Sequence, residues 1–266
     1  MVVSKHAEAR RLLERGRALL KSAPEEAIDL IHRALDAFHE LEQPRGQAEC
    51  LLELSIHELR RADFAEALRL AERAVIEARR AGDPEGEGMG LHWAAVAALG
   101  ADDEARGASC HRAAIPLLSR SGRSELERRS HEALVDLALD AGSLEEARQH
   151  LEEAERLLGE APPAEEAAQL WERHSRLRAA GGELERAIEA MQAAVACVSG
   201  LFQPGQGGLE AMYLVDLGDL QRRAGLPEAA RASYRGAERI YEAQAMGGRL
   251  RCVRERLERL DSFVPR

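Results

Sequence analysis

Apolar residues recur along the chain at the three- and four-residue intervals of an α-helix. Residues Ala67, Leu70, Ala71, Ala74 and Val75 fall on one helical face, and Arg and Glu occupy the positions between them. Similar stripes follow one another, with short breaks, over most of the sequence. The pattern therefore predicts a chain of consecutive amphipathic helices.

One short motif recurs between these stripes. A small or turn-forming residue is followed by acidic residues and then by an Ala that opens an apolar stripe. The motif occurs six times, at intervals of 40, 38, 42, 40 and 43 residues, and closes at Ala27, Ala67, Ala105, Ala147, Ala187 and Ala230. Gly suits the left-handed end of a helix, and acidic residues suit the N-terminus of the next. A repeat of this length is typical of stacked helical hairpins.

Each repeat is expected to form one antiparallel hairpin. The predicted pairs are 4–21 with 24–41, 44–61 with 64–81, 85–99 with 102–120, 123–140 with 144–159, 163–180 with 183–201, and 207–224 with 227–246. A final helix at about 248–261 has Leu250, Val253, Leu257 and Leu260 on one stripe and Arg opposite, as a capping helix requires. Residues 1–266 are predicted to form a single domain.

Two connections are rich in helix-breaking residues. They are residues 82–90 and 202–208, each with several Gly and one Pro. The simpler interpretation is a longer loop between hairpins, and the alternative is a hinge or a loop that contacts a partner. Neither segment is long enough to link separate domains.

The repeat resembles the tetratricopeptide repeat. The sixth repeat matches that family's signature positions at Leu214, Leu217, Gly218, Gly225, Ala230, Tyr234 and Ala237, and the fifth at Trp171 and Ala187. The resemblance covers roughly residues 4–246 and implies an all-α, right-handed α-solenoid of about six hairpins. The repeats here have about 40 residues instead of 34, and Leu or Ala replaces most large aromatic residues. Such variants are similar to the helical sensor regions of large bacterial transcription activators and to several scaffold proteins.

Composition supports an all-α protein. The chain has no Thr and no Asn, and Val and Ile together number 17, so residues that favour strands and hairpin turns are scarce. A net charge of −10 disfavours nucleic acid and anionic membranes as partners. Arg greatly outnumbers Lys, which is typical of bacteria with GC-rich genomes. No signal peptide or membrane-spanning run is recognisable, so a cytoplasmic protein is expected.

Motifs for catalysis or metal binding are missing from the sequence. Four widely spaced cysteines, Cys50, Cys110, Cys197 and Cys252, are interpreted as small core residues, and the histidines as packing residues. None of the His-Glu pairs continues as HExxH, and no P-loop or GxSxG motif occurs. Cys110 and His111 are neighbours, but adjacent helical residues point about 100° apart. We therefore predict no catalytic residue, no metal and no cofactor.

The resemblance implies that the first helix of each hairpin lines a concave groove. The candidate partner-binding residues at these positions are Leu52, Ile56, Leu59, Arg129, Glu132, Asp136, Gln169, Glu172, Arg176, Asp219, Arg222 and Arg223. The N-terminal positions, with Ala94 and Ala97, are apolar, and the C-terminal ones carry both signs of charge. A partner segment is therefore expected to place apolar side chains in the first half and a charged end in the second. Alternatively, tight curvature closes the groove on itself.

A protein- or peptide-binding adaptor or scaffold is the leading interpretation. The second is a ligand- or peptide-sensing module of a bacterial signalling or transcription-regulatory system, which would need a deep enclosed pocket. An enzyme with several ionisable groups converging in one cleft, and self-assembly through exposed faces, are weaker alternatives. The pattern specifies no oligomeric state.

Overall fold

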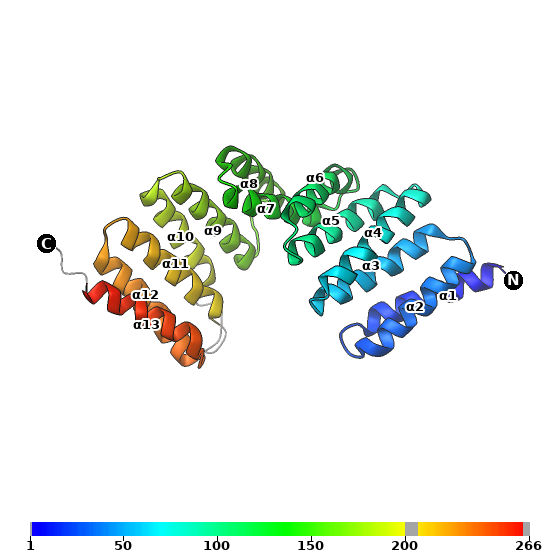
Figure 1. Cartoon of the computed structure of the whole chain (residues 1–266), viewed down its shortest axis with the longest axis horizontal. Helices are drawn as coiled ribbons and strands as arrows, with labels where there is room; N and C mark the ends of the chain where they lie inside the picture. The colour runs from blue at the N-terminus through cyan, green and yellow to red at the C-terminus, as the bar shows by residue number, and fades with distance from the viewer. Residues whose placement is uncertain (1, 200–206, 263–266) are drawn as a thin grey trace. The chain divides into compact units, whose positions relative to one another are not determined.

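A computed structural model describes residues 2–199 and 207–262 and consists of helices joined by short turns (Figure 1). The described segments contain no strand. The helices are α1 (Val2–Leu19), α2 (Pro24–Glu40), α3 (Pro44–Arg60), α4 (Phe64–Ala81), α5 (Pro84–Gly100), α6 (Glu104–Arg120), α7 (Ser124–Asp140), α8 (Leu144–Leu158), α9 (Ala164–Ala180), α10 (Leu184–Val198), α11 (Gly208–Arg223), α12 (Pro227–Ala243) and α13 (Gly247–Ser262). The predicted helices and the final helix are confirmed within a few residues. Residues 202–206 of the second breaker-rich connection lie outside the described residues.

The chain contacts divide into two compact units, Met1–Leu137 and Ala138–Arg266, with the boundary inside α7. Within each unit, consecutive helices pack in pairs, such as α3 with α4, α5 with α6, α9 with α10 and α11 with α12. Contacts also join α3 to α5, two first helices of successive hairpins. The organisation as a single domain stays a prediction.

One turn geometry is repeated at nine helix ends among the described residues. At Ala62, the backbone has a φ of 59°, its N–H donates to the Leu59 carbonyl, and the next N–H, of Asp63, donates to the Glu58 carbonyl. These are the two hydrogen bonds of a Schellman motif. Equivalent turns are centred on residues 42, 62, 82, 102, 122, 142, 182, 225 and 245. The structural repeat is therefore a half-hairpin of about 20 residues, and these nine turns include both turns within hairpins and turns between them.

The left-handed turn position predicts opposite effects of two matched substitutions. Ala62→Gly should raise the free energy of unfolding by roughly 0.5–1 kcal/mol, because Gly removes the left-handed penalty of about 1–2 kcal/mol at some entropic cost. Gly142→Ala, at φ 72° with open space around a new Cβ, should lower it by a similar amount. Urea unfolding measures both. Equal effects of the same sign would contradict this account.

The first breaker-rich segment is helical, contrary to the prediction of a loose connection. Only Gly82 and Asp83 form the turn, and α5 begins at Pro84 with an Asp83 side-chain cap on the Gly86 N–H at 3.1 Å. A Cβ on Gly90 would lie 2.7 Å from the Val75 side chain. The glycines of this segment therefore permit close helix packing rather than a hinge.

Buried Ala, Leu and aromatic residues form the cores of the units. In unit 1, Phe38 is fully buried against Gly46, whose added Cβ would lie 2.5 Å from the ring. In unit 2, Tyr234 packs in the same way against Gly218. The interpretation of the cysteines as core residues holds for Cys50, whereas Cys110 and Cys197 are half-buried and Cys252 is exposed.

Candidate functional site

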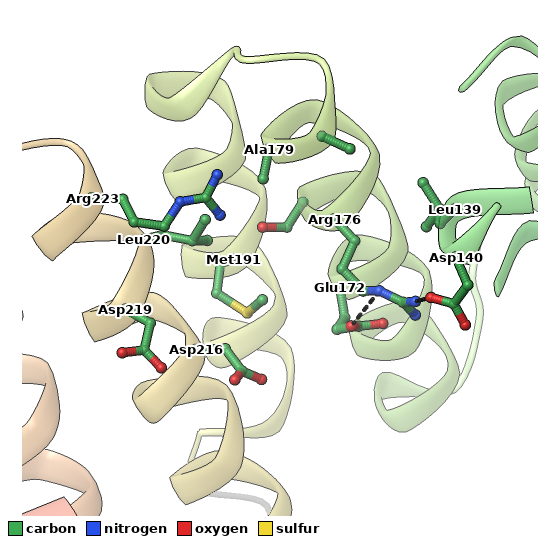
Figure 2. Close-up of a pocket in the computed structure, with 12 residues that line it drawn as sticks. Leu139, Asp140, Glu172, Arg176, Ala179, Met191, Asp216, Asp219, Leu220 and Arg223 are labelled. Carbon is green, nitrogen blue, oxygen red and sulfur yellow. Dashed lines mark hydrogen bonds and ion pairs between the residues drawn. The ribbon is translucent and has the colours of Figure 1, made fainter. Parts of the chain in front are cut away.

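A groove in unit 2 brings together several of the predicted partner-binding residues. It is a hollow of about 420 Å³, and Figure 2 shows charged side chains from α7, α9 and α11 along it. The lining residues are Leu139, Asp140, Glu172, Ser175, Arg176, Ala179, Ala180, Met191, Asp216, Asp219, Leu220 and Arg223. Its walls thus combine both signs of charge with an apolar floor, as peptide-binding grooves commonly do.

Arg176 is held between two carboxylates of the groove. Its Nη2 lies 3.4 Å from Asp140 Oδ1, and its Nε lies 3.7 Å from Glu172 Oε1 (Figure 2). The position of Arg176 follows from helix spacing, because Glu172 lies one turn earlier on α9. This cation is therefore already neutralised within the groove.

Asp219 is also fully engaged. Tyr234 Oη donates a hydrogen bond to Asp219 Oδ1 at 2.7 Å, and Arg256 Nε of α13 lies 3.2 Å from Asp219 Oδ2. Burial and this hydrogen bond raise the pKa of Tyr234 to about 12, so the phenol stays a donor at neutral pH. Gly218 makes the bond possible by letting the Tyr234 ring lie against α11.

Asp216 differs from its neighbours. Its carboxylate makes no hydrogen bond or ion pair with any residue that the structure describes, although it is half-buried one helical turn from Asp219 (Figure 2). Burial, and then the negative charge of Asp219, raise the pKa of Asp216. The charges of Arg256 and Arg176 oppose this rise without forming a direct ion pair with Asp216. Arg223 is an exposed cation on the same helix that is also unpaired within the described part of the chain. The groove therefore contains two charged side chains, Asp216 and Arg223, that lack a direct partner among the described residues.

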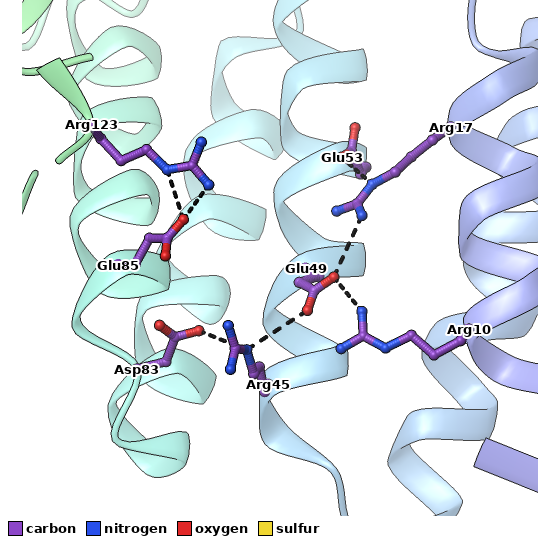
Figure 3. Close-up of polar contacts among 8 residues, drawn as sticks. All are labelled: Arg10, Arg17, Arg45, Glu49, Glu53, Asp83, Glu85 and Arg123. Atoms are coloured by element: carbon purple, nitrogen blue, oxygen red, sulfur yellow. Dashed lines mark hydrogen bonds and ion pairs between the residues drawn. The ribbon is translucent and has the colours of Figure 1, made fainter. Parts of the chain in front are cut away.

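Unit 1 presents a contrasting surface along its first helices. Figure 3 shows a ladder of ion pairs from α1 through α3 and α5 to the start of α7. Arg10 Nη1 lies 2.6 Å from Glu49 Oε2, Arg17 Nε lies 2.7 Å from Glu53 Oε1, and Arg45, Asp83, Glu85 and Arg123 continue the series. Charges on this face are largely matched internally. Such exposed pairs contribute about 0–1 kcal/mol each and leave little unmatched charge for a partner.

The predicted residues are distributed between the two units. Glu172, Arg176, Asp219 and Arg223 line the unit 2 groove, whereas Gln169 and Arg222 are exposed on the same helices outside its lining. In unit 1, Leu52 and Glu132 are buried, Ile56, Leu59 and Asp136 are half-buried, and Arg129 is exposed beside Glu125. Their role in binding stays a prediction. Ala94 and Ala97 are buried core residues, so they offer no apolar surface to a partner.

Sequence reasoning missed Asp216 and the contribution of α13. The Asp216/Asp219 pair, three residues apart on one helical face, was the available signal for the first. Arg256 was assigned to the solvated face of a cap, and only the fold brings it to Asp219.

The described residues contain no group of three or more His, Cys, Asp or Glu side chains placed to hold a metal ion. No helix within the described ranges is both long enough and apolar enough to cross a membrane.

This chain is similar to known proteins in structure, but no match is found from its sequence. No protein-family model matches the sequence, and no curated protein matches it. Among solved structures, the apo form of RapI is similar with a TM-score of 0.67 at 13% identity, covering 94% of this chain and 95% of that one.

Two further structures have a TM-score of 0.60. The TPR-like repeats of a putative kinesin light chain from Podospora anserina are 17% identical over 72% of this chain and 92% of theirs. Acl4, an assembly chaperone of RpL4, is 19% identical over 96% of this chain and 99% of its own. The chain therefore has the all-α fold of tetratricopeptide-like helical repeat proteins.

Proposed function

We propose that this protein is a non-catalytic adaptor that binds a peptide or an extended protein segment in the unit 2 groove. The observation that carries the proposal is that Asp216 and Arg223 have no direct ion-pair partner among the described residues, in a hollow whose remaining charges are paired. A segment carrying complementary charges would replace the water on both. On the first helices of unit 1, in contrast, most charges are matched by ion pairs.

The form of the groove favours an adaptor over a sensor of a small effector. Asp140 and Arg223 on its lining are exposed, so a chain could lie along the groove rather than be enclosed in it. Structural neighbours support the same class of function. One of them is named as the assembly chaperone of another protein.

Blocking the groove should abolish binding. Ala180 is exposed at the end of α9 and lines the hollow, so Ala180→Trp should fill part of it with little effect on the core. We expect 12-residue peptides selected from a random display library on the wild-type chain to bind Ala180→Trp at least 10-fold more weakly. Isothermal titration with the synthetic peptides measures the loss.

The matched control is Ala232→Trp, which adds the same side chain at an exposed position of α12 outside the groove lining. It should leave affinity unchanged, and circular dichroism melting should show that both variants are folded. Selected peptides that bind Ala180→Trp as tightly as wild type would overturn the assignment of the groove.

A further inference from the structure

Asp216 lines two neighbouring hollows of unit 2. The first is the groove between α7, α9 and α11, and the second, of about 340 Å³, lies between α11, α12 and α13. The second hollow is lined by Met212, Val215, Asp216, Tyr241, Gly248, Arg249, Cys252, Val253 and Arg256. A ligand that reaches Asp216 in the groove is therefore next to the second hollow.

The second hollow is suited to an apolar side chain. Met212 is 39% exposed and Val215 is half-buried beside it, so both present apolar surface to the hollow. Val253 closes the hollow from α13, and Tyr241 contributes a buried ring from α12. A volume of about 340 Å³ accommodates one or two aliphatic side chains.

The carboxylate at the shared edge, Asp216, has no direct hydrogen bond or ion pair among the described residues. Arg256 and Arg176 oppose the burial-driven rise in the pKa of Asp216 through their charges, but neither forms a direct ion pair with it in the described structure. Arg256 Nε lies 3.2 Å from Asp219 Oδ2 instead. Arg176 is engaged by Asp140 and Glu172. A half-buried carboxylate without a hydrogen-bond donor is stabilised by an incoming ammonium or guanidinium group. The same raised pKa of Asp216 noted above is consistent with this lack of a partner.

We propose that unit 2 recognises a peptide segment in which a Lys or Arg side chain pairs with Asp216 and a neighbouring aliphatic side chain enters the hollow of Met212, Val215 and Val253. This inference rests on the proposed groove function and specifies its ligand. The segment belongs to a partner protein and is basic where this chain is acidic. Net charge favours the same choice, because a chain of −10 attracts basic partners over long range.

Peptide selection provides the test. Random 12-residue peptides selected on the wild-type chain should be enriched in Lys or Arg next to Leu, Ile, Val or Met. For a selected peptide, Asp216→Asn should weaken binding at least 10-fold, and so should Lys→Gln in the peptide. Because both changes remove the same contact, their combination should cost little more than either alone. Glu258→Gln, an exposed carboxylate on α13 outside both hollows, is the matched control and should leave binding unchanged.

A separate variant tests the apolar hollow of Met212, Val215 and Val253. Met212→Gln keeps the length of the side chain but makes the wall polar, so it should weaken binding several-fold and reduce the preference for an aliphatic residue. Circular dichroism melting establishes that Asp216→Asn and Met212→Gln are folded before titration.

Two results would overturn the inference, and they are distinguishable. Peptides without a basic residue, blocked by Ala180→Trp but bound equally by wild type and Asp216→Asn, would refute this ligand class while the groove function stands. Peptides unaffected by both Ala180→Trp and Asp216→Asn would refute the groove function as well.

Discussion

Unit 1 should lose about 4 kcal/mol of its free energy of unfolding when the pH falls from 7.5 to 5, because two buried imidazoles stay neutral in the fold. His92 is 2% exposed, and its Nδ1 lies 2.8 Å from Ser130 Oγ. His111 is 1% exposed, its ring centre lies 5.3 Å from that of His92, and neither ring nitrogen has a partner in the described structure. Protonating either ring would place an uncompensated charge in the core.

The loss of stability at low pH follows from the pKa values of the two histidines in the folded and unfolded states. Burial lowers the pKa of His92 to about 3, and the nearby His111 adds to the effect; burial lowers the pKa of His111 to about 4. In the unfolded chain both should titrate near 6.5. The unfolded state therefore takes up protons as the pH falls below 6.5, while the folded state does not until about pH 4. Each histidine contributes about 2 kcal/mol to the loss at pH 5.

Urea unfolding followed by Trp fluorescence at several pH values measures this loss. Trp171→Phe leaves Trp93, whose ring centre lies 5.1 Å from that of His92, as a reporter of unit 1. His111→Leu should halve the acid loss and raise stability at pH 7.5, because it removes two unsatisfied buried nitrogens. His32→Gln, at an exposed position, should leave the loss as in wild type. A pH-independent free energy between 7.5 and 5 would contradict the argument.

Helix positions could be predicted from the sequence because each helix carries a complete local signal. The stripe at Ala67, Leu70 and Ala71 gave the buried face of α4, and all three side chains are buried. The turn at Gly142 could be read from residue type alone. The same turn at Ala62 could not, because Ala has no intrinsic preference for the left-handed conformation and adopts it here only where the packing of α3 and α4 demands it.

The errors arose where the meaning of a residue depends on its neighbours in space. Gly86 and Gly90 break isolated helices, yet they lie within α5, where Gly90 meets the Val75 side chain. The candidate groove shows the same dependence. Glu172 and Asp219 were predicted from the resemblance to the tetratricopeptide repeat, but whether a charge is free or already paired, as for Asp216 and Asp219, depends on contacts from other helices.

Arg128→Met should lower the free energy of unfolding of unit 1 by about 3–5 kcal/mol, because it leaves the carboxylate of Glu132 buried without its partner. The Arg128 and Glu132 side chains are 4% and 8% exposed and form an ion pair one turn apart on α7. Glu132 has no other ion-pair or hydrogen-bond partner among the described residues. Arg128, in contrast, also bonds Glu125 Oε2 at 2.7 Å.

Arg128 has a second carboxylate partner and Glu132 does not, so the two substitutions should differ in cost. Glu132→Gln should lower the free energy of unfolding less than Arg128→Met, because Arg128 keeps its ion pair with Glu125. Arg128→Met combined with Glu132→Leu should come within about 1–2 kcal/mol of wild type, since an apolar pair removes both buried charges. Urea unfolding of these three variants in the Trp171→Phe background measures the differences. A cost below about 1 kcal/mol for Arg128→Met would contradict the prediction and would mean that water reaches Glu132. Because removing either side chain changes stability, a binding defect in a Glu132 variant is evidence for a contact with a partner only when the variant is shown to be folded.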